Sequence, residues 1–569
     1  LLHSLGIRRE DMLSTVEGRA RQWRSATHDL GLLVVLDNIE EPALLAELVP
    51  ASPSATVILI SRVNAAAFLA EGAERIEVAP FNHDHSKTLL EKVCGPRRLR
   101  DEPQAVDGLL ELCAGRPGTV ALLGGCLATS PTLSLSELLR DIAARSKGRS
   151  HETATIIARR IVIESLGAPV RELYRMLSAH PGEDFPPALA EELAGEAAAT
   201  LLREMEDKQL LTAKPSGRWR MAGGSGNDPE AARPILDWYL AMARRADTKA
   251  MGPKRLRLSE VDDTTARDPH WDEPGDALDW LEAEASNLVA LQRFAVDHGW
   301  DDAAVAIEES LWVLYVKRPF PGYQESTSRL AIEAARRLSD RRLESRMRAQ
   351  RGRCLWKSGA YEGALEESLR ARELAVGEDN LEGSAAEMTG RVYLRLGQYD
   401  DAIEIFDFAV RIYERIGNTR GTALARQFAA QAHTGKREYE RAGSLLHQAL
   451  KGFAATNATG DRGRALIDLA KLEIRLDSEA PGAFPSKSGG LESVLSILDD
   501  AERCLWANGM HLRLAEAVTL HGDVLLALDR PEEARGAWQQ ALDLQLSQHN
   551  GEGPEASQLR AKLSADHPE

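Results

Sequence analysis

The alternation of hydrophobic and polar positions divides this chain into a short region with strand-like patterns and a long region with helical ones. Two short apolar runs, within residues 31–38 and 55–62, each end on polar residues. Runs of this kind are typical of strands buried in a parallel sheet, which present polar side chains at their carboxyl ends. A helical segment at 41–48 joins them, and a third strand is predicted at 75–78. We therefore expect α/β structure up to about residue 149.

A glycine- and proline-containing turn interrupts the helical patterns of residues 82–149. The predicted helix at 103–113 stops at Ala114-Gly115-Arg116-Pro117-Gly118, and an apolar helix follows at 119–128. Glycine and proline end the first helix and force a tight backbone turn. Such a turn allows a ligand to approach the backbone closely, but an ordinary helix–helix connection has the same composition. Both interpretations stay open at this point.

Residues 152–222 have the pattern of a small separate unit. Helical stretches at 170–179, 187–194 and 197–208 lead into two short strand-like segments around Ser216-Gly217. Three helices followed by a hairpin predict a winged helix, which can read DNA through its third helix. Here the end of the third helix, residues 201–208, carries three acids against two bases. We therefore favour a structural role between domains.

The C-terminal part of the chain repeats itself. Tyr361, Tyr399 and Tyr439 recur 38 and 40 residues apart, and alanine follows each of them three residues later. A terminal copy contains Gly522, Pro531, Ala534 and Trp538. Small alanines recur where two helices must approach closely, so this pattern predicts a solenoid of helix pairs, with repeats slightly longer than about 34 residues.

Composition narrows the class further. Aromatic residues make up only 5% of the 569 residues, which favours stacked helices over a β-rich fold. The net charge of −17 argues against nonspecific binding of nucleic acid by this chain. Five scattered cysteines form no Cys-x-x-Cys pair, which predicts free thiols and a cytoplasmic protein. The sequence contains no apolar run long enough to span a membrane, nor a recognisable nucleophile–base set.

The ends of the two apolar runs carry candidate chemistry for a nucleoside triphosphate. Asp37 ends the first run, where a nucleotide-bound Mg²⁺ needs an oxygen ligand, and Arg62 ends the second, where a terminal phosphate needs a cation. The phosphate-binding loop Gly-x-x-x-x-Gly-Lys-Ser/Thr is absent from the 569 residues. We expect that the chain is a fragment of a longer protein whose phosphate-binding part precedes Leu1. A pseudo-NTPase that never had the loop is the alternative.

The order of these motifs resembles the NB-ARC type of STAND NTPase, specifically the actinobacterial regulators in which a nucleotide switch and a winged helix precede tetratricopeptide (TPR) repeats. Residues 33–38 are similar to the Walker B strand of that family, and residues 60–62 to its arginine-bearing sensor strand. Residues 113–117 resemble its Gly-x-Pro motif, whose proline packs against the nucleotide. Residues 236–240 and 280–288 resemble the segments that lead into the repeats.

The resemblance implies a site for ADP or ATP with Mg²⁺ in the intact protein. It gives Asp37 the Mg²⁺, Arg62 the γ-phosphate and Pro117 the nucleotide contact. The residues implied to bind the cofactor are Asp37, Asn38, Ser61, Arg62, Gly115 and Pro117.

Two departures from the family concern the stability of the off state and the hydrolysis of ATP. Family members carry a His-Asp pair at the end of the winged helix, where the histidine contacts the β-phosphate of ADP; the aligned positions here are Ala222 and Gly223. Asn38 follows Asp37 where a more active ATPase offers a second carboxylate as base. The first departure implies that the latch of the off state is missing, and the second implies slow turnover of ATP or none.

The resemblance also implies a domain order for a mainly α protein with a partial α/β domain, a winged helix and an α-solenoid. The expected domains are the C-terminal part of the nucleotide-binding domain at 1–80, a helical ARC subdomain at 81–150, a winged-helix-like domain at 151–226, a helical linker region at 227–345 and TPR-like repeats at 346–569.

Two functional hypotheses follow. In the first, the chain belongs to a signal-transducing or transcription-regulatory switch: ADP holds a closed form, and a protein or peptide partner on the TPR groove favours exchange to ATP and homo-oligomer formation. DNA is contacted only through a domain outside this chain. In the second, the chain is a non-enzymatic TPR interaction scaffold with a degenerate NTPase remnant.

Overall fold

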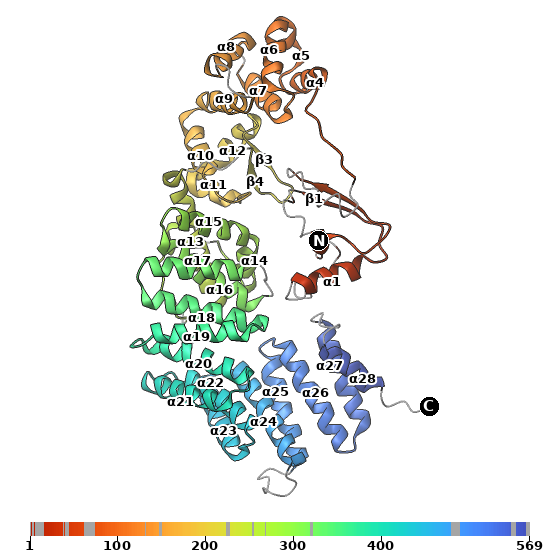
Figure 1. Ribbon diagram of the computed structural model, residues 1–569, viewed down its shortest axis with the longest axis vertical. Coiled ribbons are helices and arrows are strands. Elements are labelled where there is room, and N and C mark those ends of the chain that lie inside the picture. The colour runs from red at the N-terminus through yellow and green to blue at the C-terminus, as the bar shows by residue number, and fades with distance from the viewer. Residues whose placement is uncertain are drawn as a thin grey trace. The chain divides into compact units, whose positions relative to one another are not determined.

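The computed structural model describes most of the chain, in two compact units (Figure 1). The first unit combines Leu1–Val63 with Leu314–Glu569, and the second is Asn64–Val313. The described residues are 2, 5, 16–37, 39, 45–61, 74–130, 132–146, 151–222, 228–252, 255–267, 269–318, 323–479, 490–547 and 554–564. Most of them are helical, which confirms the predicted mainly α class.

The N-terminal part of the first unit contains a pair of parallel strands. Helix α1 (Val16–Thr27) precedes β1 (Leu33–Asp37), and α2 (Leu45–Leu48) precedes β2 (Thr56–Ile60). The strands pair in register from Leu33 with Thr56 to Asp37 with Ile60. The indole of the buried Trp23 donates to the carbonyl of Leu48 at 2.8 Å, which links α1 to α2. The two predicted parallel strands are therefore confirmed.

The expected burial of these strands on both faces is wrong for the described part of the chain. Val34 and Leu36 are buried, whereas the alternate side chains of Leu33 and Val35 are 65% and 51% exposed. On β2, Ile58 and Ile60 are also exposed, so only one face of this strand pair is covered. Apolar runs in the sequence do not specify which neighbour covers them.

The third predicted strand does not form. Residues 74–80 have no regular structure, and the side chains of Ile76 and Val78 are 85% and 92% exposed. In the described part of the chain, β1 and β2 pair only with each other. A strand needs a neighbouring backbone for its hydrogen bonds, so the alternation of apolar residues at 75–78 is not sufficient.

The second unit begins with a group of helices. They are α4 (His83–Cys94), α5 (Pro96–Asp101), α6 (Pro103–Cys113), α7 (Pro117–Thr129), α8 (Leu135–Ser146) and α9 (His151–Glu164). The side chain of Asn82 caps α4 by accepting from the backbone N–H of His85 at 2.8 Å. Helix α7 is buried along most of its length because apolar residues lie on every side of it.

Three helices and a hairpin follow, in the predicted order. The helices are α10 (Ala168–Ser178), α11 (Pro187–Ala194) and α12 (Ala198–Asp207), with the short 3₁₀ turn η4 (Gly195–Ala197) before α12. Strands β3 (Leu211–Ala213) and β4 (Trp219–Met221) pair antiparallel, with Leu211 opposite Met221. The assignment of this group as a winged helix stays a prediction.

A helical region completes the second unit and continues into the first. It contains α13 (Pro229–Met251), the 3₁₀ turn η5 (Asp263–Thr265), α14 (Pro274–Ala283), α15 (Ala285–Asp297) and α16 (Asp301–Lys317). The carboxylate of Asp228 caps α13 by accepting from the N–H of Ala231 at 3.0 Å.

The first unit continues as stacked helix pairs (Figure 1). They are α17 (Gln324–Arg337), α18 (Arg341–Ser358), α19 (Tyr361–Leu374), α20 (Asp379–Arg395), α21 (Tyr399–Arg415), α22 (Thr419–Gly435), α23 (Tyr439–Ala455), α24 (Thr459–Glu479), α25 (Leu491–Trp506), α26 (His511–Ala527), α27 (Pro531–Ser547) and α28 (Pro554–Ser564). This array confirms the predicted TPR-like solenoid.

The repeated residues have clear packing roles in this array. Gly397 adopts a φ of 73° and separates α20 from α21, which begins at Tyr399. A Cβ atom on Gly435 of α22 would lie 2.5 Å from the ring of Tyr399. A glycine is therefore needed at position 435, where the ring of Tyr399 packs against the next helix. No described helix combines the length and apolarity that crossing a bilayer requires.

Candidate functional site

Asp37 and Ser61 lie at the same edge of the β1–β2 pair. Asp37 is the last residue of β1 and pairs in register with Ile60, after which Ser61 follows. Asp37 is exposed, so its carboxylate is accessible from solvent. The N–H of Ile39 donates to the carbonyl of Ile60 at 3.3 Å and extends the pairing beyond the strands. The carboxyl ends of two parallel strands thus present an acid and a hydroxyl together.

Two of the predicted cofactor-binding residues, Asn38 and Arg62, lie outside the described residues. Their predicted roles stay predictions. The same holds for Gly223, one of the two positions aligned with the His-Asp pair of the family. The other position, Ala222, is described, and its carbonyl accepts from the guanidinium of Arg159 at 2.5 Å.

The turn that contains Gly115 and Pro117 is shaped by a backbone contact. Ala114 and Gly115 both have positive φ values, 50° and 68°, after the end of α6. The N–H of Phe81 donates to the carbonyl of Gly115 at 2.8 Å, and a Cβ atom on Gly115 would lie 2.1 Å from the carbonyl oxygen of Phe81. The close backbone approach predicted for this turn is thus made to the segment that leads into α4.

The residues after Gly115 are open to solvent. Arg116 precedes α7, Pro117 is its first residue, and both are exposed together with Gly118. Proline is suited to a first helical position because no intrahelical acceptor exists for an N–H there. Asp37 and Ser61 belong to the first unit of the structure, and Gly115 and Pro117 to the second.

A buried polar network that the sequence analysis missed lies in the second unit. Its centre is the carboxylate of Glu284, only 1% exposed, which accepts from both terminal nitrogens of Arg218. The same carboxylate accepts from the hydroxyl of Tyr239 at 3.0 Å and from the amide of Asn287 at 2.7 Å. Asp184 accepts from Nε of Arg218 at 2.5 Å. The network therefore joins the segments before β4 and α11 to α13 and α15.

The protonation states of the neighbouring groups are set by burial. Burial lowers the pKa of His180 to about 4, so its imidazole is neutral at pH 7. Nδ1 of His180 accepts from the N–H of Gly182 at 3.0 Å, and Nε2 lies 3.3 Å from the hydroxyl of Tyr239. Burial and the charge of Glu284 raise the pKa of Tyr239 well above its usual value. The hydroxyl of Tyr239 therefore stays protonated and donates a hydrogen bond to Glu284.

The segments at 236–240 and 280–288 supply Tyr239, Glu284 and Asn287 to this network. The resemblance singled out these segments without indicating what they do. The sequence offers one signal for this network, namely that Glu284 and Asn287 lie three residues apart within an apolar helical stretch. Arg218 and Asp184 are too far away in the sequence to be connected with them.

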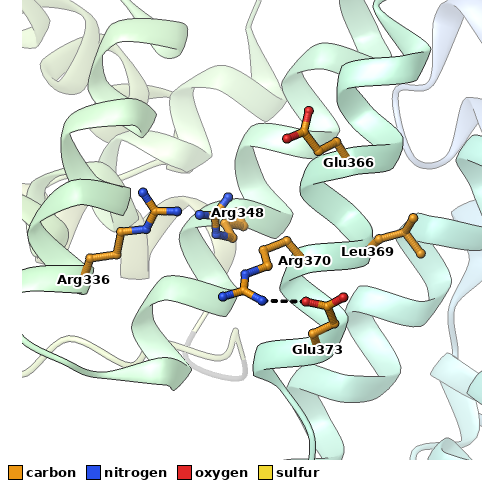
Figure 2. Close-up of a pocket in the computed structure, with 6 residues that line it drawn as sticks. All are labelled: Arg336, Arg348, Glu366, Leu369, Arg370 and Glu373. Atoms are coloured by element: carbon orange, nitrogen blue, oxygen red, sulfur yellow. Dashed lines mark hydrogen bonds and ion pairs between the residues drawn. The ribbon is translucent and has the colours of Figure 1, made fainter.

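A polar pocket of about 380 Å³ lies beside α17, α18 and α19 (Figure 2). Its arginines already have carboxylate partners: Arg370 pairs with Glu373 at 2.6 Å and Arg348 with Glu367 at 2.6 Å. Arg336 lies 3.0 Å from Glu344. Because these charges compensate one another, the pocket offers little attraction to a charged ligand.

Known proteins resemble this chain in sequence over nearly its whole length. Regulatory protein AfsR of Streptomyces coelicolor is 24% identical over 543 residues, which cover 91% of this chain and 50% of AfsR. AfsR of Streptomyces griseus is 24% identical over 542 residues, 90% of this chain and 53% of that protein. The chain thus spans about half the length of these curated relatives. No protein-family profile matches it. The resemblance predicted from the sequence, to actinobacterial regulators of the NB-ARC type with TPR repeats, is confirmed.

Solved structures with helical repeats also resemble the chain, at low similarity. A STAND protein with a tetratricopeptide repeat sensor from Pyrococcus horikoshii is 13% identical, covers 96% of this chain and 84% of its own, and has a TM-score of 0.30. A Rap protein complexed with competence and sporulation factor is 12% identical, covers 58% of this chain and 81% of its own, and has a TM-score of 0.39. These TM-scores are too low to support conclusions about function.

Proposed function

We propose that this chain, which resembles AfsR-type regulators over nearly all of its length, belongs to a nucleotide-dependent regulatory switch. In this proposal its TPR-like repeats bind a protein or peptide partner, and ADP or ATP at the N-terminal region controls the assembly of the protein, including self-association on activation. The position of Asp37 carries the nucleotide part of the proposal. It lies exposed at the carboxyl end of a parallel strand, where open α/β sheets bind ligands.

The carboxylate of Asp37 is a suitable ligand for a Mg²⁺ ion whose other ligands are mainly nucleotide phosphates and water. In the described part of the chain, no three His, Cys, Asp or Glu residues are grouped so that they could hold a metal by themselves. Mg²⁺ retains several waters and binds one or two carboxylates together with phosphate oxygens, so a single acid at this edge is sufficient. When bound, the ion neutralises phosphate charge. The other residues that the resemblance assigns, to the nucleotide and not to the ion, are Asn38, Ser61, Arg62, Gly115 and Pro117.

The free energy for switching comes from unequal contacts with the two nucleotides. A ligand shifts a conformational equilibrium only by its difference in affinity for the two states. Arg62, in its predicted role on the γ-phosphate, contacts ATP but not ADP and therefore supplies such a difference. Turnover is slow or absent in this proposal, because Asn38 stands where an active ATPase has a second carboxylate. DNA, if it is a target, is bound by a domain outside this chain.

The scaffold without nucleotide control is the second candidate, and two observations favour it. In the part of the chain that the structure describes, β1 and β2 form a sheet of two strands with exposed alternate side chains, and residues 75–78 belong to no sheet. The contact of Gly115 with Phe81 also accounts for that glycine without any ligand. In this case the repeats still bind a partner, but ADP and ATP do not change the affinity for that partner.

Replacement of Asp37 by alanine in the full-length gene product tests the proposal. We expect Mg²⁺-dependent binding of ATP to weaken by about tenfold or more, which corresponds to about 1.4 kcal/mol. Binding in the presence of a chelator should change little, because Asp37 acts through the ion. Isothermal titration with and without Mg²⁺ measures both affinities.

Asp29→Ala is the matched control, since the side chain of Asp29 is 94% exposed in the turn before β1. It removes the same charge close to the same strand but not at its carboxyl end. Equal affinities for Asp37→Ala, Asp29→Ala and the unchanged protein would contradict the role assigned to Asp37.

A further inference from the structure

A buried histidine lies where the three helices and hairpin of residues 168–222 meet helices α13 to α15. We call this region of contact the junction and residues 168–222 the hairpin group. His180 follows the end of α10 and is only 4% exposed. Its ring centre lies 6.1 Å from that of Phe185 and 5.6 Å from that of Tyr239. A Cβ atom on Gly182 would lie 2.5 Å from Cε1 of the same ring, so the imidazole has little room to rotate.

The hydrogen bonds of His180 determine which ring nitrogen carries the proton. Nδ1 accepts from the N–H of Gly182 at 3.0 Å, so the neutral ring carries its hydrogen on Nε2. Nε2 lies 3.3 Å from the hydroxyl oxygen of Tyr239. That oxygen also accepts from the amide of Asn287 at 3.2 Å, while the hydroxyl donates to Glu284. Neutral His180 therefore completes a chain of donors and acceptors that crosses the junction.

A second proton on the ring is incompatible with this chain. It would sit on Nδ1 and point at the N–H of Gly182, so that a donor would face a donor and the hydrogen bond would be lost. Rotation of the ring offers no relief, because Phe185, Tyr239 and Gly182 surround it. The charge would also be placed in a site with almost no access to water, which is unfavourable by itself.

The charged groups around His180 already balance one another. Glu284, between α14 and α15, pairs with Arg218 before β4, and Asp184, before α11, pairs with Arg218 and Lys214. Two acids thus face two bases, and an imidazolium would add a third positive charge without an acid of its own. Burial is the main cause that lowers the pKa of His180 to about 4; Arg218 adds to the shift, and the charges of Glu284 and Asp184 oppose it.

We propose that the junction is acid-sensitive: uptake of a proton by Nδ1 of His180 releases the hairpin group from α13 to α15. In the joined state the imidazole is neutral and enclosed. In the released state it is open to water, from which it takes the proton, and only hydrogen bonds and packing contacts are broken. This inference goes beyond the proposed function and does not depend on nucleotide binding.

The direction of the pH dependence follows from the two states of His180. Its pKa is about 4 in the joined state, below the ordinary value of 6.5 that an exposed ring has. Between these values only the released state binds the proton, so acid favours release. From pH 7 to pH 5 the equilibrium constant for release should rise by about twentyfold. Asp184 stays ionised in this range: burial raises its pKa, but hydrogen bonds from Lys214 and Arg218 outweigh that effect and lower it.

Hydrogen exchange of the 569-residue chain at pH 7 and pH 5, resolved to single amides by mass spectrometry, tests this proposal. The amide of Gly182 reports on His180, to which it is bonded. After correction for the intrinsic effect of pH, its protection should fall by about twentyfold at pH 5. The amide of Phe185 donates to the carbonyl of Trp219 within the hairpin group and should keep its protection, because that group stays folded.

Release of the hairpin group is measured separately by hydroxyl-radical footprinting. The side chain of Tyr239 is inaccessible in the joined state and should be oxidised more readily at pH 5 than at pH 7. Faster exchange at Gly182 without additional oxidation of Tyr239 would mean that one hydrogen bond opens while the junction stays joined, which overturns the proposal.

His180→Gln removes the group that takes the proton. Exchange at Gly182 should then lose its dependence on pH, even where the absolute protection at pH 7 is lower than in the unchanged protein. His85→Gln is the matched control, because His85 is exposed on α4 of the same unit. This variant should keep the twentyfold change that is expected of the unchanged protein.

Three results overturn the proposal: no change at Gly182 in the unchanged protein, the same change in His180→Gln, or loss of protection at Phe185 together with Gly182, which indicates unfolding of the hairpin group. The unchanged protein decides the matter if His180→Gln does not fold, since both amides and Tyr239 are measured in it. No nucleotide is added, so these results and the nucleotide content of the full-length product can fail independently of each other.

Discussion

Replacement of Glu284 by alanine should lower the free energy of unfolding of the second unit by about 3–5 kcal/mol. The carboxylate is nearly inaccessible and accepts from Arg218, Tyr239 and Asn287. Its removal leaves the guanidinium with Asp184 alone and leaves the buried hydroxyl of Tyr239 without its carboxylate acceptor, whereas the amide of Asn287 keeps the carbonyl of Asp184. Breaking a buried ion pair from one side costs more than the pair contributes, because the remaining charge stays desolvated.

Denaturant unfolding followed by circular dichroism measures this loss. Asp297→Ala is a suitable control, because Asp297 is an exposed acid in the last turn of α15. An acid at the C-terminal end of a helix is unfavourable for the helix dipole, so this variant should be neutral or slightly more stable. A loss below about 1 kcal/mol for Glu284→Ala, the value typical of an exposed ion pair, would show that the network is hydrated in solution.

Replacement of Gly115 by alanine should destabilise the helical group of α4, α6 and α7 by more than about 2 kcal/mol. A positive φ alone costs a residue with a side chain about 1–2 kcal/mol. Ala114 bears that cost at a φ of 50°, so the angle alone is not prohibitive. The larger effect comes from the new Cβ atom, which would lie 2.1 Å from a backbone oxygen of Phe81 that cannot rotate away.

Gly118→Ala in the same turn should have the opposite sign. Gly118 is the second residue of α7 and has open space around its Cα, so alanine there gains up to about 1 kcal/mol of helix propensity. Unfolding midpoints of the two variants, measured side by side, test this difference. Similar midpoints for both variants would mean that the contact between Gly115 and Phe81 is loose.

The periodic features of this chain could be predicted from its sequence because they depend on local spacing. The tyrosine recurs as Tyr361, Tyr399 and Tyr439, each with an alanine three residues later, and the ring of Tyr399 fills the space beside Gly435 on the next helix. Parallel pairing of β1 and β2 was likewise predictable, since a helical segment between two apolar runs favours that connection. In both cases neighbouring residues along the chain determine the structure.

Features that depend on distant residues could not be predicted in the same way. The strand expected at 75–78 has the right composition, but among the described residues this segment joins neither of the two sheets. Arg218 and Glu284 are 66 residues apart, and nothing in their local sequences connects them. Arg391 resembles an ordinary solvent-facing residue of a helix, and only the stacking of three helices reveals that Trp356 and Phe428 enclose it. For Asn38 and Arg62, the sequence remains the sole basis of their assignment.

The nucleotide content of the full-length gene product tests the central claim most directly. The purified protein is denatured, and the nucleotide that it releases is identified and quantified by chromatography against the protein concentration. We expect ADP in a near-stoichiometric amount, because in the proposed switch ADP holds the closed form. Folded protein that contains no nucleotide, and that binds neither added ADP nor added ATP with Mg²⁺, would contradict the switch and leave the interaction scaffold as the function of this chain.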